Sequence, residues 1–150
     1  MQHDSTTPTL EQFKDACRRE FAFLFELGYA ELQDPDSAER FKLRFSNGTL
    51  NVTISGENYG QHAGVSFFHM DGREAPPVMF VPWSERTWRP SFDSTGFSQL
   101  DDIRIEALRI ARYCRDVLAG DSAKFDAVAK EWRRMTDSNY ARSLQNRKLP

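Results

Sequence analysis

A chain of 150 residues with 39% hydrophobic and 28% charged side chains has the composition of one globular domain, long enough to bury a core without disulfides. Its formal charge of −2 excludes the strong positive field that generic nucleic-acid binding needs. The first residues, MQHDSTTPTLEQF, lack the pattern of a secretory signal, and nowhere do 18 apolar residues run together. We therefore expect a cytoplasmic protein with neither a nucleic-acid nor a membrane partner.

The near-neutral charge hides an asymmetry along the chain. Residues 1–60 carry 10 acidic and 6 basic side chains, whereas residues 130–150 carry 2 acidic and 6 basic ones. The N-terminal part is therefore acidic and the C-terminal segment is basic.

The first predicted element is a helix over residues 10–27. Thr9 and Gln12 have the spacing of a capping box, and Gly28 supplies the left-handed residue that commonly ends a helix. Apolar residues three and four positions apart define its buried face: Phe13, Cys17, Phe21, Leu24 and Phe25. This face is expected to pack on a sheet, opposite Leu43, Val52 and Val65.

From residue 29 the apolar period changes to two, which indicates strands. The segment RFKLRFS alternates apolar and cationic side chains, TLNVTIS and AGVSFFHM continue the alternation, and Asp71-Gly72 turns the chain toward PPVMFVPW. Asn47 and Gly48 favour a type I′ hairpin turn, because both residue types tolerate positive φ. These signals predict an antiparallel meander of four or five strands.

The last third of the chain is predicted to be helical. Asp101 or Asp102 can cap one helix, which Gly120 ends, and Asp121 or Ser122 can cap another. The expected apolar stripes are Ile105, Leu108, Ala111, Cys114 or Tyr113, Val117 and Leu118 in the first, and Phe125, Val128, Ala129, Trp132 and Met135 in the second. We expect an exposed polar face at Arg104, Arg109, Arg112 and Arg115.

The order of these elements is helix, meander, helix, helix. Strands and helices that are segregated along the chain favour an α+β fold, with the two C-terminal helices packed on one sheet face. We therefore predict a single α+β domain over residues 1–150, with tails that fray at 1–8 and 137–150.

None of the usual catalytic or metal-binding residues is arranged for chemistry. His3, His62 and His69 have no neighbouring Asp, Cys or Ser in a known catalytic spacing. Cys17 and Cys114 form no CxxC motif or zinc site, and we expect them to be reduced and buried. The paired carboxylates at 34/36 and 101/102 fit turn and cap chemistry. We therefore expect no catalytic, cofactor or metal site.

The segment VPWSERTWRPSFDSTGF, residues 81–97, has neither a helical nor a strand period. A connection of this length in a compact domain is usually functional or mobile. Two interpretations stay open: its aromatic residues cover one end of the core as a lid, or they remain partly exposed and bind a protein partner, because Trp and Arg are enriched in interface hot spots. The candidate partner-binding residues are Trp83, Arg86, Trp88, Arg89, Phe92 and Phe97.

Three segments carry a family resemblance: FKDACRREFAFLFELGYAELQD, the strands around RFSNGTLNVTIS, and RIARYCRDVLAGDSAKFDAVAKEW. They resemble small bacterial immunity proteins that neutralise polymorphic or contact-dependent toxins. The shared features are F-x-F-L-x-x-x-G-[FY], at residues 21–29, and L-x-G-D, at residues 118–121. The resemblance covers residues 10–135 and departs from the usual pattern in the long Trp/Arg/Pro loop. It implies a non-enzymatic protein that blocks one toxin, encoded beside a toxin-like gene.

A secretion chaperone is an alternative of the same size, which would work as a dimer and bind an effector segment in apolar grooves. A small enzyme is less favoured, because it needs a concave cluster of polar groups that this sequence does not display. The expected partner is therefore a protein, either a toxin or a secreted effector, and the chain is a monomer or a homodimer.

Overall fold

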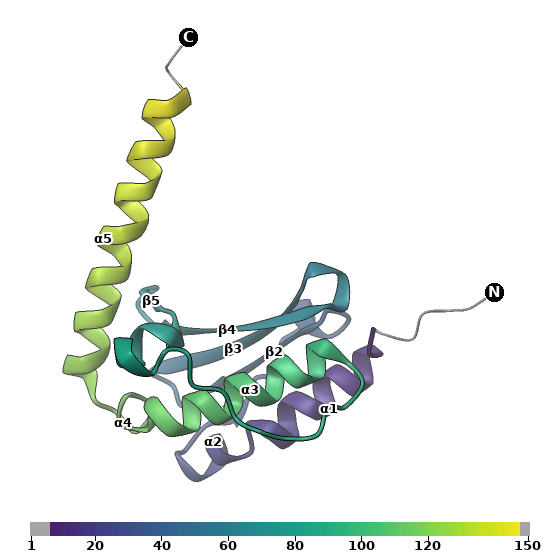
Figure 1. Cartoon of the computed structure of the whole chain (residues 1–150). Coiled ribbons are helices and arrows are strands. Elements are labelled where there is room, and N and C mark those ends of the chain that lie inside the picture. Colours follow the sequence, from purple (N-terminus) through teal and green to yellow (C-terminus); the bar gives the residue numbers. More distant parts are fainter. Residues whose placement is uncertain (1–6, 148–150) are drawn as a thin grey trace.

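The computed structural model describes residues 7–147 and has the predicted α+β architecture, with helices against an antiparallel sheet (Figure 1). The five strands pair in sequence order, which makes a meander: β1 (Ala30–Glu31), β2 (Lys42–Ser46), β3 (Leu50–Glu57), β4 (His62–His69) and β5 (Glu74–Ala75). The helices are α1 (Leu10–Glu20), α2 (Phe23–Glu26), α3 (Ser98–Tyr113), α4 (Arg115–Leu118) and α5 (Ser122–Arg147).

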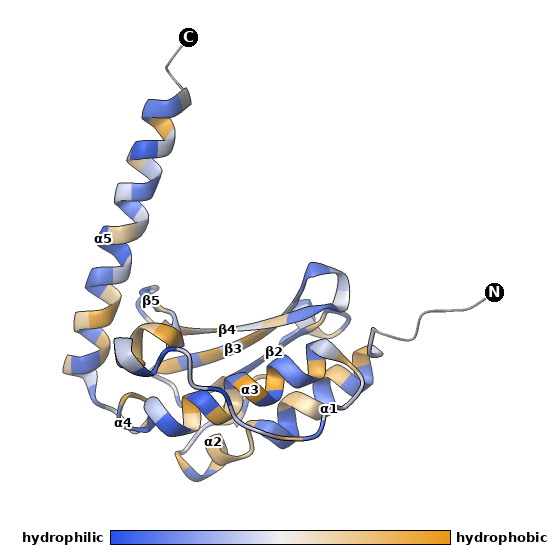
Figure 2. Cartoon of the chain, viewed as in Figure 1, coloured by the Kyte–Doolittle hydropathy of each residue, from blue (hydrophilic) through white to orange (hydrophobic). Residues whose placement is uncertain are grey.

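The core lies between one face of the sheet and the helices α1 and α3, which pack against each other. Strand register aligns apolar residues in rows across this face: Leu43, Ile54 and Val65 in one row, and Phe45, Val52 and Phe67 in the next. All of these are buried except Val65, which is half-buried. The opposite face carries polar rows such as Arg44, Thr53 and Ser66. Figure 2 shows the apolar residues gathered where the helices meet the sheet.

The expected single helix over residues 10–27 is interrupted, although its capping box forms as predicted. Phe21 leaves the helical conformation, with φ −97° and ψ 16°, and a separate turn of helix follows. The run from residue 21 to 25 has more apolar side chains than one helical face can bury, and the change of direction buries both Phe21 and Leu24. The expectation for Phe25 is wrong: it is 50% exposed and contacts Phe45 edge-on from the rim of the core.

The β2–β3 hairpin forms where Asn47 and Gly48 predict it, but its turn is not type I′. That turn needs positive φ at two successive residues, whereas here only Gly48 has it, at +89°. Asn47 instead uses its side chain: Oδ1 accepts hydrogen bonds from the backbone N–H groups of Thr49 (2.9 Å) and Leu50 (2.7 Å). The side chain therefore closes the turn without a left-handed asparagine.

The fifth strand ends earlier than the sequence suggests. Only Glu74–Ala75 pairs with β4, and the following segment forms a 3₁₀ turn at Pro77–Phe80 and another at Trp83–Glu85. Pro76, Pro77 and Pro82 have no backbone N–H to donate to a sheet, so the expected strand PPVMFVPW cannot continue the ladder.

The helix α3 begins before the expected caps, at Ser98, and it turns a different face to the core. The residues that it buries are Gln99, Leu100, Ile103, Ala107 and Ile110. The expected Ile105 and Ala111 are half-buried and Leu108 is 41% exposed. The expected and the observed sets both have helical spacing, so periodicity alone does not show which face of α3 is buried. Cys114, Val117 and Leu118 are buried as predicted.

The last helix, α5, begins at the predicted cap, where Asp121 Oδ1 accepts a hydrogen bond of 3.1 Å from the backbone N–H of Lys124. Its first turns pack against β5 through buried Phe125 and Ala129. The helix then leaves the body of the protein and continues to Arg147, into the segment expected to fray (Figure 1). Residues 148–150 and 1–6 of the expected tails lie outside the described residues. No described helix combines the length and apolar composition that crossing a bilayer requires.

Candidate functional site

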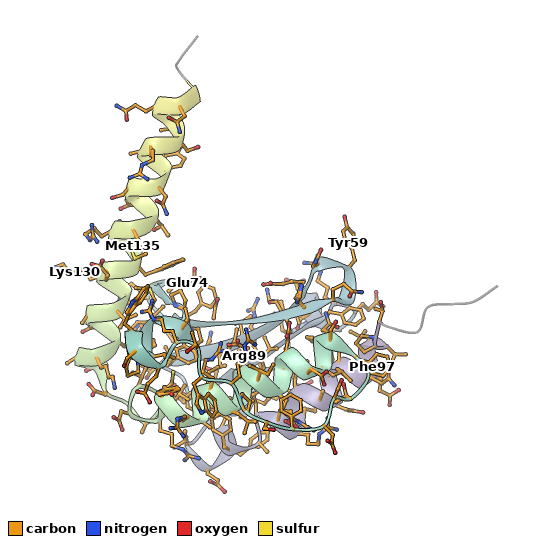
Figure 3. All side chains as sticks on the ribbon, viewed as in Figure 1. Tyr59, Glu74, Arg89, Phe97, Lys130 and Met135 are labelled. Carbon is orange, nitrogen blue, oxygen red and sulfur yellow. The ribbon has the colours of Figure 1, made fainter. Side chains whose placement is uncertain are left out.

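Residues 82–97, here called the strap, run along α3 from its C-terminal end toward its N-terminus (Figure 1). Trp88 lies against Tyr113, in the last turn of α3, and Thr95 binds Asp101, in its first turn. Figure 3 labels Arg89 and Phe97, which lie along this path. The strap is therefore an ordered segment fixed to one helix at both ends.

The N-terminal turn of α3 holds the strap through one carboxylate. Asp101 Oδ1 accepts hydrogen bonds from the backbone N–H of Thr95 (2.8 Å) and from its hydroxyl (2.9 Å), and Oδ2 accepts one from the hydroxyl of Ser94 (2.6 Å). Partial burial raises the pKa of Asp101, but the bonds from Ser94 and Thr95 outweigh that effect and hold it below its usual value. The anchor therefore requires the ionised carboxylate.

The middle of the strap lies on a cation of α3. The Arg104 guanidinium sits over the ring of Phe92, 5.1 Å from its centroid, and Arg104 Nε donates a hydrogen bond of 3.1 Å to Glu20 of α1. Phe92 is half-buried in this position. It therefore covers an ion pair that joins α1 to α3.

Trp88 packs on the C-terminal end of α3. Its ring meets Tyr113 edge-on, with centroids 6.0 Å apart, and the Arg112 guanidinium lies 4.9 Å from the indole centroid. The hydroxyl of Tyr113 also donates a hydrogen bond of 3.3 Å to Glu85. These contacts leave Trp88 half-buried. At this residue the strap covers the helix as a lid would.

Trp83 is different, because 80% of its surface is exposed. The Arg86 guanidinium stacks over its ring at 4.4 Å from the centroid, and Arg86 Nε donates a hydrogen bond of 3.3 Å to the backbone carbonyl of Val81. The cation–π contact and this bond hold both side chains in one arrangement. The pair presents a large aromatic surface and a cation on the outside of the protein.

The structure thus divides the six candidate residues between the two open interpretations. Trp83 and Arg89 are exposed, and Arg86, which stacks on Trp83, is half-buried. Trp88 and Phe92 are held against α3, and Phe97 is half-buried against the core at the start of that helix.

Sequence reasoning missed the α3 residues that support the strap. Two arginines of the face expected to be merely solvated, Arg104 and Arg112, stack on strap aromatics. Arg109 on the same helix donates a hydrogen bond of 3.0 Å to Glu106, whose pKa burial raises. The sequence does contain a signal for these contacts: an arginine-rich helix directly follows a loop rich in aromatic residues.

Among the described residues, the histidines and cysteines considered for chemistry make no hydrogen bond to the strap, unlike Asp101. His62 Nδ1 is 3.0 Å from Asp102 Oδ2, and the His69 ring packs beside Phe125. Cys17 and Cys114 are free and buried, and burial raises the pKa of both thiols. Within residues 7–147, no group of three or more His, Cys, Asp or Glu side chains is placed to hold a metal ion.

A groove of about 540 Å³ lies between α5 and the β4–β5 turn. Its central cation, Arg73, is already paired with Asp71 (2.9 Å) and Asp126 (2.6 Å), and it lies over the ring of Phe125. These contacts join α5 to the sheet. The charged residues of the groove therefore have a structural role, and they do not require a ligand.

Comparison with protein-family models gives no match, and neither the curated proteins nor the solved structures contain a significant match to this chain.

Proposed function

We propose that this chain is a non-catalytic protein-binding protein and that the exposed Trp83, with Arg86 stacked on it, is the centre of its binding surface. The supporting observation is an 80% exposed tryptophan carrying a stacked arginine on a loop that is fixed to α3. A single exposed aromatic side chain is ordinary on a protein surface, but an exposed Trp that carries a stacked Arg on an ordered loop has the composition of an interface hot spot. Arg89 and the exposed edges of Trp88, Phe92 and Phe97 would extend the surface along the strap.

The chemistry of this surface fits a protein partner with an acidic rim around an apolar pocket. Trp83 supplies a rigid contact area, and Arg86 can pair with a carboxylate through two parallel hydrogen bonds. Because the strap is anchored by Asp101 and stiffened by Pro82 and Pro90, less conformational entropy is lost on binding.

Within this class, we propose an immunity protein that binds and neutralises a bacterial toxin in the cytoplasm. Support comes from the resemblance of residues 21–29 and 118–121, together with a surface suited to one-to-one binding. The protein would act by covering the toxin, with no bond made or broken.

The test begins with the chain as bait in an extract of its native cytoplasm, with mass spectrometry of the proteins that co-purify. Affinity for the recovered partner is then measured by calorimetry for the wild type and for Trp83→Ala. Loss of a hot-spot tryptophan should weaken binding by about 2 kcal/mol or more, which is roughly 30-fold. The Tm should stay close to that of the wild type, because Trp83 contributes little to the core.

Trp88→Ala is the matched control, since it removes the same side chain five residues away. It should lower the Tm, because Trp88 packs on Arg112 and Tyr113. A stoichiometric partner whose affinity is unaffected by Trp83→Ala would contradict the proposed surface. A recovered partner that is chemically altered by this protein would contradict the non-catalytic role.

A further inference from the structure

Three arginines, here called the arginine triad, hold their guanidinium groups over aromatic rings. The guanidinium carbon lies 4.4 Å from the ring centroid for Arg86 over Trp83, 4.9 Å for Arg112 over Trp88 and 5.8 Å for Arg115 over Phe23. The rings belong to the strap and to α2, whereas Arg112 and Arg115 lie where α3 ends and α4 begins. Figure 1 shows these segments together at one end of the molecule.

Neighbouring contacts connect the members of the triad. The hydroxyl of Tyr113 donates a hydrogen bond of 3.3 Å to Glu85, the residue before Arg86, and the guanidinium carbon of Arg112 lies 5.4 Å from the centroid of the Tyr113 ring. Arg115 follows Arg112 by three positions. Arg112 and Arg115 are exposed and Arg86 is half-buried. The three guanidinium groups therefore occupy adjacent parts of the surface.

Each arginine of the triad uses only its Nε–H group for a hydrogen bond inside the protein. The acceptors are backbone carbonyls for Arg86 (3.3 Å) and Arg115 (3.1 Å), and the Tyr113 hydroxyl for Arg112 (3.1 Å). Among the described residues, no hydrogen bond involves the Nη atoms of the triad. The ring and the bond at Nε hold each guanidinium group in place, and the two Nη groups remain as a pair of donors that can bind a carboxylate.

The triad differs in this respect from arginines that form ion pairs within the protein. Arg18 donates from Nε and Nη2 to the two oxygens of Glu31, at 2.9 Å each, and Arg134 binds Glu131 in the same way. In the part of the chain that the structure describes, no salt bridge involves a member of the triad. The donor positions that a glutamate fills elsewhere are therefore open in the triad.

Charge favours an acidic protein over a nucleic acid as the ligand. With Glu85, the carboxylate beside it, the triad has a local charge of +2, and the other 17 basic and 21 acidic residues give the rest of the chain −4. The adjacent Asp116 lies 3.8 Å from Lys124, which balances its charge. A long polyanion would extend beyond the triad onto an acidic chain that repels it, whereas a small acidic patch on a protein can match the triad alone.

We propose that the arginine triad binds clustered carboxylates of a protein partner. Each guanidinium group would take one carboxylate through its two Nη groups, and the rings beneath would supply apolar contact area. This inference rests on the proposed function, because it names the chemistry of the partner that Trp83 contacts. It extends the binding surface from the strap to the ends of α3 and α4 and to α2.

NMR signals of the arginine Nε–H groups in the full chain, titrated with an octaglutamate peptide, test the proposal. We expect the signals of Arg86, Arg112 and Arg115 to shift, because their Nη groups gain a ligand. The signal of Arg18 should not shift, because Glu31 already occupies its donors. Binding should be weaker in about 500 mM than in about 50 mM NaCl, because salt screens the attraction. A triad that does not shift, or that shifts no more than Arg18, overturns the proposal.

Three variants separate the triad from the overall charge. Arg115→Glu should weaken octaglutamate binding about fivefold or more, because it removes one ion pair and adds a repulsion. Arg115→Lys keeps the charge but lacks the planar fork, so it should also weaken binding. Arg40→Glu is the matched control, since it makes the same charge change at another exposed position, and it should leave binding unchanged. Equal weakening by the two charge reversals overturns the proposal.

Two further measurements identify the ligand class and separate this inference from the proposed function. An octathymidylate strand should bind more weakly than octaglutamate, and tighter binding with the same arginine shifts would overturn the assignment to a protein. Affinity for the partner recovered from the cytoplasm should fall in both Trp83→Ala and Arg115→Glu. A partner that responds to Trp83→Ala alone would leave the proposed function standing and overturn the role of the triad.

Discussion

The hydroxyl of Tyr29 donates a hydrogen bond of 2.9 Å to the backbone carbonyl of Leu118, across 89 positions of sequence, and both residues are buried. Tyr29 lies between α2 and β1, and Leu118 is the last residue of α4. The bond therefore fixes the N-terminal helices to the C-terminal ones beneath the sheet.

Tyr29→Phe should lower the free energy of unfolding by about 1–3 kcal/mol, because it leaves a buried carbonyl without its donor. Urea denaturation of both proteins measures the difference. Tyr59→Phe is the control, since Tyr59 is 98% exposed and points away from the sheet (Figure 3). An equal effect in the two variants would mean that the hydrogen bond to Leu118 does not contribute to the free energy of unfolding.

Phe21→Ala and Phe25→Ala should separate two neighbouring aromatics that the sequence places on one face. Phe21 is completely buried, so its loss should cost about 3–5 kcal/mol, whereas Phe25 is half exposed and should cost about 1 kcal/mol or less. Thermal and urea unfolding check both values. Similar costs would show that Phe25 belongs to the core after all.

Asp101→Asn should release the N-terminal end of the strap. The native pKa of Asp101 lies below its usual value, so its stabilising effect is present above about pH 4 and is lost as pH falls through the native pKa. The protection factors of the amides at residues 94–97, which compare exchange with the intrinsic rate at the same pH, should therefore fall below about pH 4 in the wild type, whereas the variant should show little protection already at pH 7. Protection that is insensitive both to pH and to this substitution would show that other contacts hold the strap.

Both cysteines should resist a thiol reagent in the native protein. Burial raises the pKa of both thiols, that of Cys114 to about 12, and neither side chain is accessible. At pH 8 their modification should proceed at the rate of unfolding and become rapid in urea. Stability should fall above about pH 9, because the thiols ionise in the unfolded chain only. Fast labelling of the folded protein would contradict the burial of these thiols.

The sequence predicts the sheet well because its alternation and turn residues are local signals. It predicts the helix faces less well: α3 has apolar residues on two sides, and only the sheet decides that Ile103 is buried and Leu108 exposed. The break after α1 has the same origin, since no local signal at Phe21 ends a helix.

The composition of the strap marked it as unusual, but its arrangement depends on contacts with α3. Nothing near Trp83 or Trp88 in the sequence distinguishes them. One is 80% exposed and the other half-buried because Tyr113 and Arg112 lie where Trp88 crosses α3. Which aromatic faces solvent is therefore a tertiary property.

The strands at the two margins of the sheet, β1 and β5, are only two residues long. Unpaired backbone groups along a long margin recruit further strands from other molecules and start fibrous aggregates. Here the two-residue strands cover their neighbours only in part, since β5 pairs with Phe67 and Phe68 alone of the eight residues of β4, and Pro76 and Pro77 directly after β5 have no N–H with which to extend the ladder. Residues 62–66 of β4 have no partner strand on that side, and α3 caps part of this edge instead: Asp102 accepts a hydrogen bond of 3.3 Å from the backbone N–H of Ala63, which removes a donor that an added strand would need.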